Sequence, residues 1–313
     1  MFNLVRNEWM KLFSRPATYV MTGLIVLAVI AATVITLFVQ SLGDGQDITW
    51  QSQLQTENTQ LEQTIATSET GFMGQNPEEQ LAINQYALEN DIAPNRAGSF
   101  WSYLESSTFL ISLIGLFAII VASGIVAGEF SWGTIKLLMI RPIARWKILL
   151  SKFITVGAFG LFLVAITAVL SVILGLIFFD PGSSVRLVFE DGQVIEKSMA
   201  AYVIRVYLFN SLDVIMLTTM AFMISAVFRN SSLAIGISLF LLFVGGTATS
   251  FIAMYYDWAK YSLFANTNLS LYEMNMPLVE GMTMQFSIVM ILIYFTIFIA
   301  LAFTIFTKRD IAS

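Results

Sequence analysis

Two residue types are missing from this chain of 313 residues, which contains neither cysteine nor histidine. Without cysteine the chain has no disulfide framework and no thiol chemistry. Without histidine it has no HExxH zinc site, no histidine-ligated haem, no histidine-rich di-iron site and no catalytic triad that uses imidazole. These absences exclude many classes of membrane enzyme.

Charged residues are also scarce. They make up 12% of the chain, whereas hydrophobic residues make up 57% and phenylalanine occurs 26 times. A soluble domain has about 25% charged residues, so this composition predicts an integral membrane protein. The net charge of −5 does not indicate a nucleic-acid partner, and the lipid bilayer is the partner that the composition requires.

Apolar runs of about 20 residues are long enough to cross the hydrocarbon core as helices. The chain has six such runs, at 18–41, 104–127, 149–179, 203–228, 233–255 and 286–306. The first is too long for a cleavable signal peptide, and no small-residue cleavage site follows it. The predicted fold is an all-α membrane protein with six transmembrane helices in a single domain over 1–313.

Lysine and arginine indicate the orientation of these spans. If the N-terminus is cytoplasmic, eleven of the sixteen basic residues fall on the inside, and nine acidic residues fall in the outer segment 42–100. Both termini are therefore predicted to be cytoplasmic. The absence of an organelle-targeting sequence fits a bacterial plasma membrane.

Residues 1–16 form a predicted amphipathic helix that ends at Pro16. Its apolar residues recur at helical spacing on one face; they are Phe2, Val5, Trp9, Leu12 and Phe13. Basic residues lie off this stripe, as expected for a helix in the membrane interface. The segment is either a simple orientation signal or an elbow helix that also contacts a partner.

Two outer insertions are predicted to be folded. Segment 42–103 indicates a small extracellular helical hairpin, with Asn76-Pro77-Glu78-Glu79 starting its second helix. It serves either as a spacer or dimer contact, or as a gate or ligand surface.

In segment 180–202, Asp191-Gly192 between two strand-like runs predicts a β-hairpin with a type I′ turn. Such a hairpin must pack against another element to be stable.

Few polar residues lie within the spans. Asp213 stands about ten residues into the fourth apolar run, one turn after Asn210, and ionisable groups at membrane depth usually face protein or water. Asp213 is either a pathway-lining or coupling carboxylate, or a structural partner in a helix-to-helix hydrogen bond or of Arg205. Gly245-Gly246 is more typical of close packing or a kink than of a substrate site.

The segment 128–148 carries the most informative pattern. Residues Gly128 to Lys152 contain five of the sixteen basic residues and one acid, Glu129. The spacing Gly128-x-x-x-x-Gly133 is that of a P-loop, but Thr134-Ile135 follows where Lys-Ser or Lys-Thr is required. No catalytic constellation is present, so ATP hydrolysis by this chain is not expected.

The layout resembles the permease subunits of type 2 ABC exporters. The resemblance rests on Glu8-Trp-Met-Lys-Leu-Phe-Ser-Arg-Pro16 and on Glu129-x-x-x-Gly-Thr-x-Lys-Leu-Leu-x-x-Arg-Pro-x-x-Arg145, and in layout it covers nearly the whole chain. It implies a homodimer or a heterodimer with a related permease. It also implies a separate cytoplasmic ATPase subunit, which holds the ATP and magnesium.

The resemblance further implies a coupling helix after the second span, at about 129–140. The coupling residues are Glu129, Phe130, Trp132, Gly133, Thr134, Lys136, Leu138, Pro142 and Arg145, and the elbow-helix residues are Glu8, Trp9, Lys11, Phe13 and Arg15. The apolar members would anchor the ATPase, the cations would form a charged rim, and Pro142 would end the helix.

Other functions stay open beside this one. A basic loop between spans is explained by orientation alone, although that does not explain Trp132, Phe130 or Gly133-Thr134. A non-transporting sensor or scaffold that binds a ligand through its extracellular hairpin is the main alternative. A membrane enzyme is disfavoured by the missing histidine and cysteine. For an exporter, the apolar spans suit a lipid, a peptide or a hydrophobic drug better than a free ion.

Overall fold

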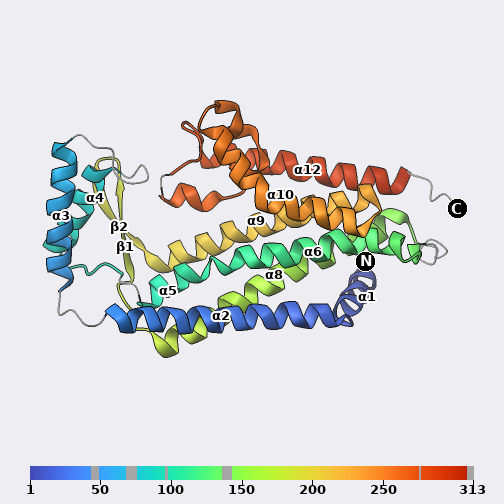
Figure 1. Ribbon diagram of the computed structural model, residues 1–313, viewed down its shortest axis with the longest axis horizontal. Helices are drawn as coiled ribbons and strands as arrows, with labels where there is room; N and C mark the ends of the chain where they lie inside the picture. The colour runs from blue at the N-terminus through green and yellow to red at the C-terminus, as the bar shows by residue number, and fades with distance from the viewer. Residues whose placement is uncertain (44–48, 68–75, 96–97, 136–142, 275, 309–313) are drawn as a thin grey trace. The chain divides into compact units, whose positions relative to one another are not determined.

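The computed structural model describes the whole chain except residues 44–48, 68–75, 96–97, 136–142, 275 and 309–313, and it is mostly helical (Figure 1). Within the described residues, six helical segments are long and apolar enough to cross a membrane, which confirms the six predicted spans. They are α2 (Pro16–Gly43), α5 (Phe100–Ser107) followed by α6 (Leu110–Ser131), α8 (Arg145–Phe178), α9 (Met199–Phe228), α10 (Ser231–Ala253) and α12 (Met284–Lys308).

The spans differ in how far the rest of the chain covers them. In its most apolar stretch, 67% of α9 is buried, and 56% of the span formed by α5 and α6, against 11% of α10 and of α12. Exposed side chains on α10 and α12, such as Phe240, Phe243 and Leu292, are large and apolar. These two helices therefore suit contact with lipid, whereas α6 and α9 form the core.

Two compact units make up the chain. The first comprises Met1–Leu27, Phe109–Ala168 and Leu208–Ser313, and the second comprises Ala28–Thr108 and Val169–Tyr207. In the first unit, buried side chains from α6, α8, α9, α10 and α12 form one apolar cluster that includes Ile119, Val156, Met216, Ala234 and Ile291.

The second unit holds the two folded insertions. Helix α3 (Trp50–Ala66) begins at Thr49, which accepts a hydrogen bond from the Ser52 N–H. Helix α4 (Pro77–Glu89) begins at the predicted cap, where the Asn76 Oδ1 accepts from the Glu78 N–H at 3.1 Å. The two helices pack against each other. Helix α4 ends at Glu89, before Asp91 adopts a positive φ of 52°.

The β-hairpin is confirmed. Strands β1 (Val185–Glu190) and β2 (Gln193–Ser198) pair antiparallel, with Glu190 opposite Gln193. Asp191 and Gly192 have φ of 50° and 78°, and positive φ at both central positions is what a type I′ turn requires. The hairpin leans on α4, where the Tyr86 hydroxyl donates a hydrogen bond to Glu196 at 3.2 Å.

Between α10 and α12, the first unit has a folded connection made of η2 (Asp257–Tyr261), α11 (Leu263–Asn266) and η3 (Leu269–Met274). This connection folds back along α10, so that Phe264 fills the space beside Gly245. Gly245 lies eight residues before the end of α10, roughly 12 Å along the helix axis. Gly245 is therefore a close-packing position, one of the two roles expected for Gly245-Gly246.

Irregular backbone at such depth needs internal hydrogen bonds. The buried amide of Asn266 supplies them, because its Nδ2 donates to the carbonyl oxygens of Lys260 and Ser262, both at 2.7 Å. Its Oδ1 accepts from the Ser287 hydroxyl at 2.7 Å. One amide thus fastens the connection to the first turn of α12.

Candidate functional site

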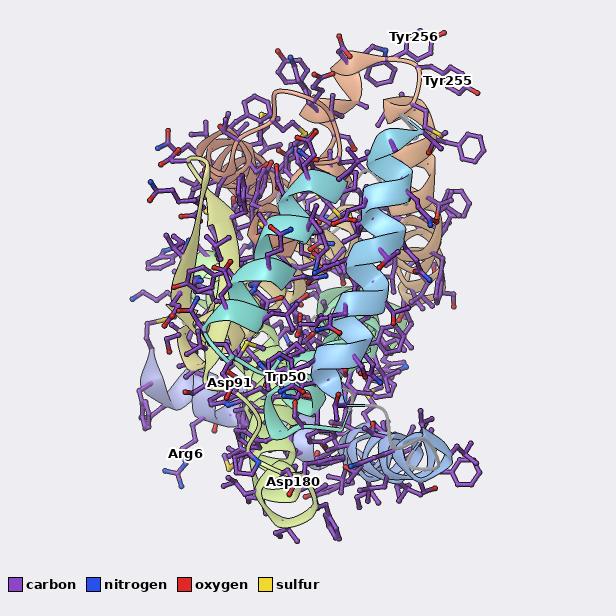
Figure 2. All side chains as sticks on the ribbon, turned by 90° about the vertical axis from the view of Figure 1, so that its left-hand side faces the viewer. Arg6, Trp50, Asp91, Asp180, Tyr255 and Tyr256 are labelled. Carbon is purple, nitrogen blue, oxygen red and sulfur yellow. The ribbon has the colours of Figure 1, made fainter. Side chains whose placement is uncertain are left out.

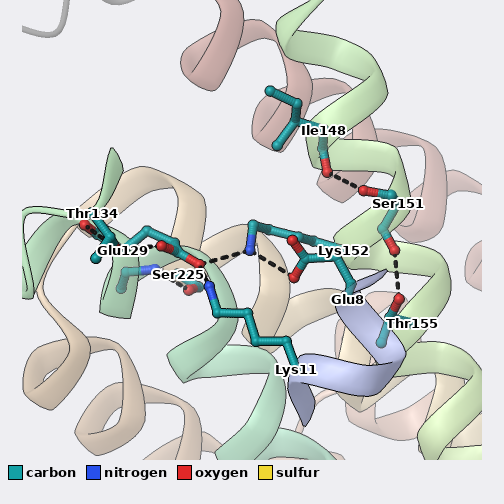
Figure 3. A network of polar contacts seen from close by, with 10 residues as sticks. Glu8, Lys11, Glu129, Thr134, Ile148, Ser151, Lys152, Thr155 and Ser225 are labelled. Carbon is teal, nitrogen blue, oxygen red and sulfur yellow. Dashed lines mark hydrogen bonds and ion pairs between the residues drawn. The ribbon is translucent and has the colours of Figure 1, made fainter. Parts of the chain in front are cut away.

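Four charged side chains meet where the N-terminal helix α1 (Phe2–Phe13) contacts the end of α6 and the beginning of α8 (Figure 3). The Lys152 Nζ lies 2.8 Å from Glu8 and 3.0 Å from Glu129. Lys11 pairs with the same carboxylate of Glu129. Two ammonium groups therefore neutralise two carboxylates, and we call these four residues the ionic cluster.

Burial makes the pairing within this cluster necessary. The side chains of Lys152 and Glu129 are 2% and 3% exposed, that of Glu8 is 12% exposed, and that of Lys11 is 42% exposed. A charge taken out of water is costly unless an opposite charge and hydrogen bonds compensate it. Each of the two buried ions has two partners of opposite charge, and Glu129 also accepts a hydrogen bond from Thr134, so the cluster is compensated as a unit.

Helical spacing accounts for the two members on α1. Glu8 and Lys11 are three residues apart, which places them on one face of that helix. Glu129 stands in the last turn of α6, where the helix dipole disfavours a carboxylate. The two lysines offset that effect, and this explains why an acid is tolerated at this end of α6.

The Gly133-Thr134 pair forms the turn that follows α6. Gly133 has φ of 71°, and a Cβ there would meet nothing within 4 Å, so the left-handed backbone is the constraint at this position. The Thr134 hydroxyl hydrogen-bonds to the carboxylate of Glu129. The glycine therefore ends the helix, and the threonine ties the turn to the ionic cluster.

Helix α1 is also fixed by its aromatic residues. The Trp9 ring lies 5.9 Å from that of Phe162 on α8, and the Phe13 ring lies 5.7 Å from it. Leu12 is buried, while Phe2 at the other end of the predicted stripe is 79% exposed. The C-terminal half of the stripe therefore packs on protein, and the N-terminal end does not.

Two tryptophans near the cluster are exposed. Trp132, directly after α6, is 66% exposed, and the Arg15 guanidinium lies 5.1 Å from the centre of its ring. Trp146, at the start of α8, is 46% exposed. Phe130 is half-buried between Phe306 and the guanidinium of Arg229. Tryptophan is enriched among the residues that carry most of the binding energy at protein interfaces.

Arg145 lies at the first position of α8, and its Nη1 donates to the Thr307 carbonyl oxygen near the end of α12 at 3.4 Å. It therefore links α8 to α12.

The expected coupling residues Lys136, Leu138 and Pro142 lie outside the described residues. The start of the expected coupling helix, Glu129 to Ser131, is the last turn of α6.

Lys152 and Ser225 were missed as site residues in the sequence. The available signal for Lys152 was a lysine inside the predicted span 149–179, since a charge in a span usually has a specific partner. Ser225 on α9 is buried beside α6, where its hydroxyl accepts from the Ala127 N–H at 2.9 Å and donates to the Ser123 carbonyl oxygen at 2.6 Å. Its hydroxyl thereby bonds to the N–H and the C=O of two α6 residues that are four positions apart.

Asp213 and Asn210 lie elsewhere in the same unit. The Asp213 carboxylate hydrogen-bonds to Thr267, and the Asn210 Nδ2 donates to the Ser270 hydroxyl at 3.4 Å. Both contacts join α9 to the connection between α10 and α12. Asp213 and Asn210 therefore tie α9 to that connection, and the two roles expected for Asp213 both stay predictions.

No group of three or more histidine, cysteine, aspartate or glutamate residues in the described part of the chain is placed to hold a metal ion. In the ionic cluster, the two carboxylates are paired with the ammonium groups of Lys11 and Lys152. The cluster joins α1, α6 and α8 through paired charges.

The spans and the folded connections define a multi-pass, largely helical membrane protein. Residues 79–312 match the family model described as "Protein of unknown function (DUF2705)", and the chain belongs to that family. It is 48% identical to the Uncharacterized protein YhcI of Bacillus subtilis (strain 168) over 317 residues, which cover 100% of both chains. It is 32% identical to the Uncharacterized membrane protein YdbK of the same organism over 215 residues, covering 68% of this chain and 84% of that one.

Proposed function

We propose that this chain is the membrane-spanning subunit of an ATP-driven exporter, which dimerises and couples to a separate cytoplasmic ATPase. The motif resemblance after the second span is the starting point. The observation that carries the proposal is the exposed Trp132, which follows Glu129, a member of the buried pair of Glu129 and Lys152, by three residues. A partner that binds this indole would move the turn after α6, which is linked through Glu129 to α1 and α8.

The mechanical path runs through named contacts. Thr134 ties the turn after α6 to Glu129, Lys152 joins Glu129 to α8, and Lys11 joins it to α1. Because the paired charges are buried, separating them is costly, so α1, α6 and α8 would move together. In this proposal Glu129 transmits force within the chain, and Trp132 and Arg15 contact the ATPase.

The proposed orientation places both termini in the cytoplasm of a bacterial cell, with the protein in the plasma membrane. Helix α1 is then an elbow helix in the inner interface, where Phe2 and Met10, both more than half exposed, face lipid. Arg6 projects away from the ribbon in Figure 2, as a headgroup-facing cation would. The pair of α3 and α4 and the β-hairpin lie outside the cell.

A test of this proposal is gentle purification of the full chain from its native membrane. An ATPase with a P-loop should accompany it in about equal amounts, and hydrolyse ATP with magnesium. The Trp132→Ala variant should insert normally and lose most of the ATPase. As a matched control, the Trp50→Ala variant at the start of α3 should keep it. Recovery of the natural chain without an ATPase would count against the exporter.

The second candidate function is a sensor or scaffold without transport. The observation in its favour is that α3, α4 and the β-hairpin form a packed polar body, joined by the bond between Tyr86 and Glu196. It predicts that no ATPase accompanies the chain, and that the Trp132→Ala variant behaves as the natural chain does.

A further inference from the structure

A group of large side chains is exposed just after α10. Met254, Tyr255, Tyr256, Trp258 and Tyr261 have exposed fractions of 75%, 72%, 59%, 58% and 52%, and we call these five residues the aromatic surface. Tyr255 and Tyr256 point away from the ribbon in Figure 2. Large exposed apolar side chains gathered in one short segment mark a contact with a partner or a membrane.

The chemistry of these side chains selects one kind of contact. Three tyrosines and one tryptophan each combine an apolar ring with a polar tip, whereas an aliphatic surface would suit the hydrocarbon core. Among the described residues, none hydrogen-bonds to the side chains of Tyr255, Tyr256 or Trp258. Their polar tips therefore need water or a headgroup, while their rings need an apolar neighbour.

The backbone beneath the aromatic surface is fixed. Ala259 between these residues is only 1% exposed. The Tyr294 hydroxyl of α12 donates to the Tyr261 carbonyl oxygen at 2.8 Å, and the Asn266 amide donates to the carbonyl oxygens of Lys260 and Ser262. The Lys260 ammonium lies 5.5 Å from the centre of the Tyr261 ring. The rings are thus displayed on a rigid support.

The aromatic surface also continues the lipid-facing side of α10. Phe240, Phe243 and Phe251 on that helix are each more than 60% exposed. The residue type changes from phenylalanine to tyrosine and tryptophan where the helix ends. This change is the one expected where a span passes from hydrocarbon to headgroups.

We propose that the aromatic surface is a membrane anchor that binds the headgroup region of the bilayer and sets the depth of α10, α11 and α12. The rings lie among the upper acyl chains, and the hydroxyl and indole groups bond to headgroup oxygens and interfacial water. Because α11 packs beside Gly245, the anchor also fixes the connection that folds back along α10. This inference is independent of whether the chain is an exporter.

Trp258 is a native reporter for this contact. The chain has six tryptophans, so a variant that keeps Trp258 and carries phenylalanine at the other five positions gives fluorescence from this site alone. The variant is placed in vesicles of phosphatidylcholine and phosphatidylglycerol. Quenching is compared between lipids with a nitroxide on the headgroup, lipids with a nitroxide in the middle of an acyl chain, and aqueous iodide.

We expect the headgroup nitroxide to quench Trp258 more strongly than the mid-chain nitroxide, with emission blue-shifted from that of indole in water. Strong quenching by iodide alone would mean that the surface faces water, and stronger quenching by the mid-chain nitroxide would place it in the hydrocarbon core. Resistance to all three quenchers would mean that protein, such as a second copy, covers it. Each of these three results overturns the proposal.

A control and a second measurement complete the test. In the same background without Trp258, an Ile297→Trp variant near the middle of α12 should be quenched best by the mid-chain nitroxide.

Since the chain has no cysteine, Tyr256→Cys in the otherwise natural chain can carry a spin label at a single site. Its accessibility to oxygen and to a water-soluble nickel complex should also give a headgroup depth, and a purely aqueous profile would overturn the anchor even if the multiple tryptophan variant failed to fold.

Discussion

The ammonium of Lys152 lies 3.0 Å from the carboxylate of Glu129, and both side chains are almost completely buried. Lys152 is also bonded to Glu8, 144 positions away in the sequence. A lysine in the first third of α8 thus joins the N-terminal helix to the end of the second span. Buried pairs of this kind are costly to break, because removal of one partner leaves the other charge uncompensated.

Replacement of Lys152 by methionine should therefore be strongly destabilising. The Lys152→Met variant keeps the length of the side chain but leaves Glu8 and Glu129 with Lys11 alone. We expect a loss of about 3–5 kcal/mol of unfolding free energy, measured by denaturation in detergent micelles. As a control, Lys197→Met removes the exposed pair with Glu190 and should cost at most about 1 kcal/mol.

A double variant separates the charge effect from lost packing. If an uncompensated carboxylate is the main cost, Lys152→Met combined with Glu129→Gln should be more stable than Lys152→Met alone, since Glu8 still has Lys11 three residues away. A double variant less stable than the single one would show that the cost comes from packing, contrary to this account of the cluster.

Gly245 and Gly246 form a natural pair for testing the close packing of α11. A Cβ at Gly245 would collide with the ring of Phe264, while a Cβ at Gly246 would meet nothing within 4 Å. Gly245→Ala should cost about 1–3 kcal/mol through overpacking. Gly246→Ala should be neutral or stabilising by up to about 1 kcal/mol, because alanine is the better helix former.

The measurement for this pair is thermal unfolding of the two variants side by side. If Phe264 is the obstacle, adding Phe264→Leu to Gly245→Ala should recover part of the loss. Equal stability of the two alanine variants would show that α11 does not pack against α10 at Gly245.

Local patterns in the sequence predicted much of this fold. The apolar runs placed the six spans to within a few residues, because span length is fixed by the bilayer. Asp191-Gly192 predicted a turn whose positive φ values the structure has, and Asn76-Pro77 predicted the start of α4. In each case the relevant interaction lies within a few residues along the chain.

Pairing across long sequence distances was not predictable in the same way. The sequence marked Glu129 as the one acid in a basic segment, but it did not indicate that Lys11 and Lys152 would converge on it from helices α1 and α8. Ser225 gave no signal at all, since an isolated serine in an apolar helix commonly bonds to its own backbone. Only tertiary packing brings its hydroxyl to α6.

The bridge made by Ser225 should protect the amide of Ala127. Ser225→Ala removes the α9 hydroxyl that bonds to the Ala127 N–H and the Ser123 carbonyl oxygen of α6, in the turn before Glu129, and should cost about 1–3 kcal/mol. Hydrogen exchange at Ala127 should become faster in this variant. Ser250→Ala, which removes an exposed hydroxyl bonded to the Gly246 carbonyl oxygen within its own helix, should change stability by less than about 0.5 kcal/mol. Unchanged exchange at Ala127 would argue against the bridge.

The proposed orientation can be tested with single cysteines, because the natural chain has none. Positively charged segments stay in the cytoplasm, so Asn7→Cys on α1 should be shielded in intact cells and Glu57→Cys on α3 should be accessible. A maleimide that does not cross membranes should therefore label the Glu57→Cys variant at once, and the Asn7→Cys variant only after the cells are permeabilised. The cysteine-free chain gives the background. Labelling of the Asn7→Cys variant in intact cells would invert the topology and place the exposed Trp132 and Trp146 out of reach of any cytoplasmic ATPase.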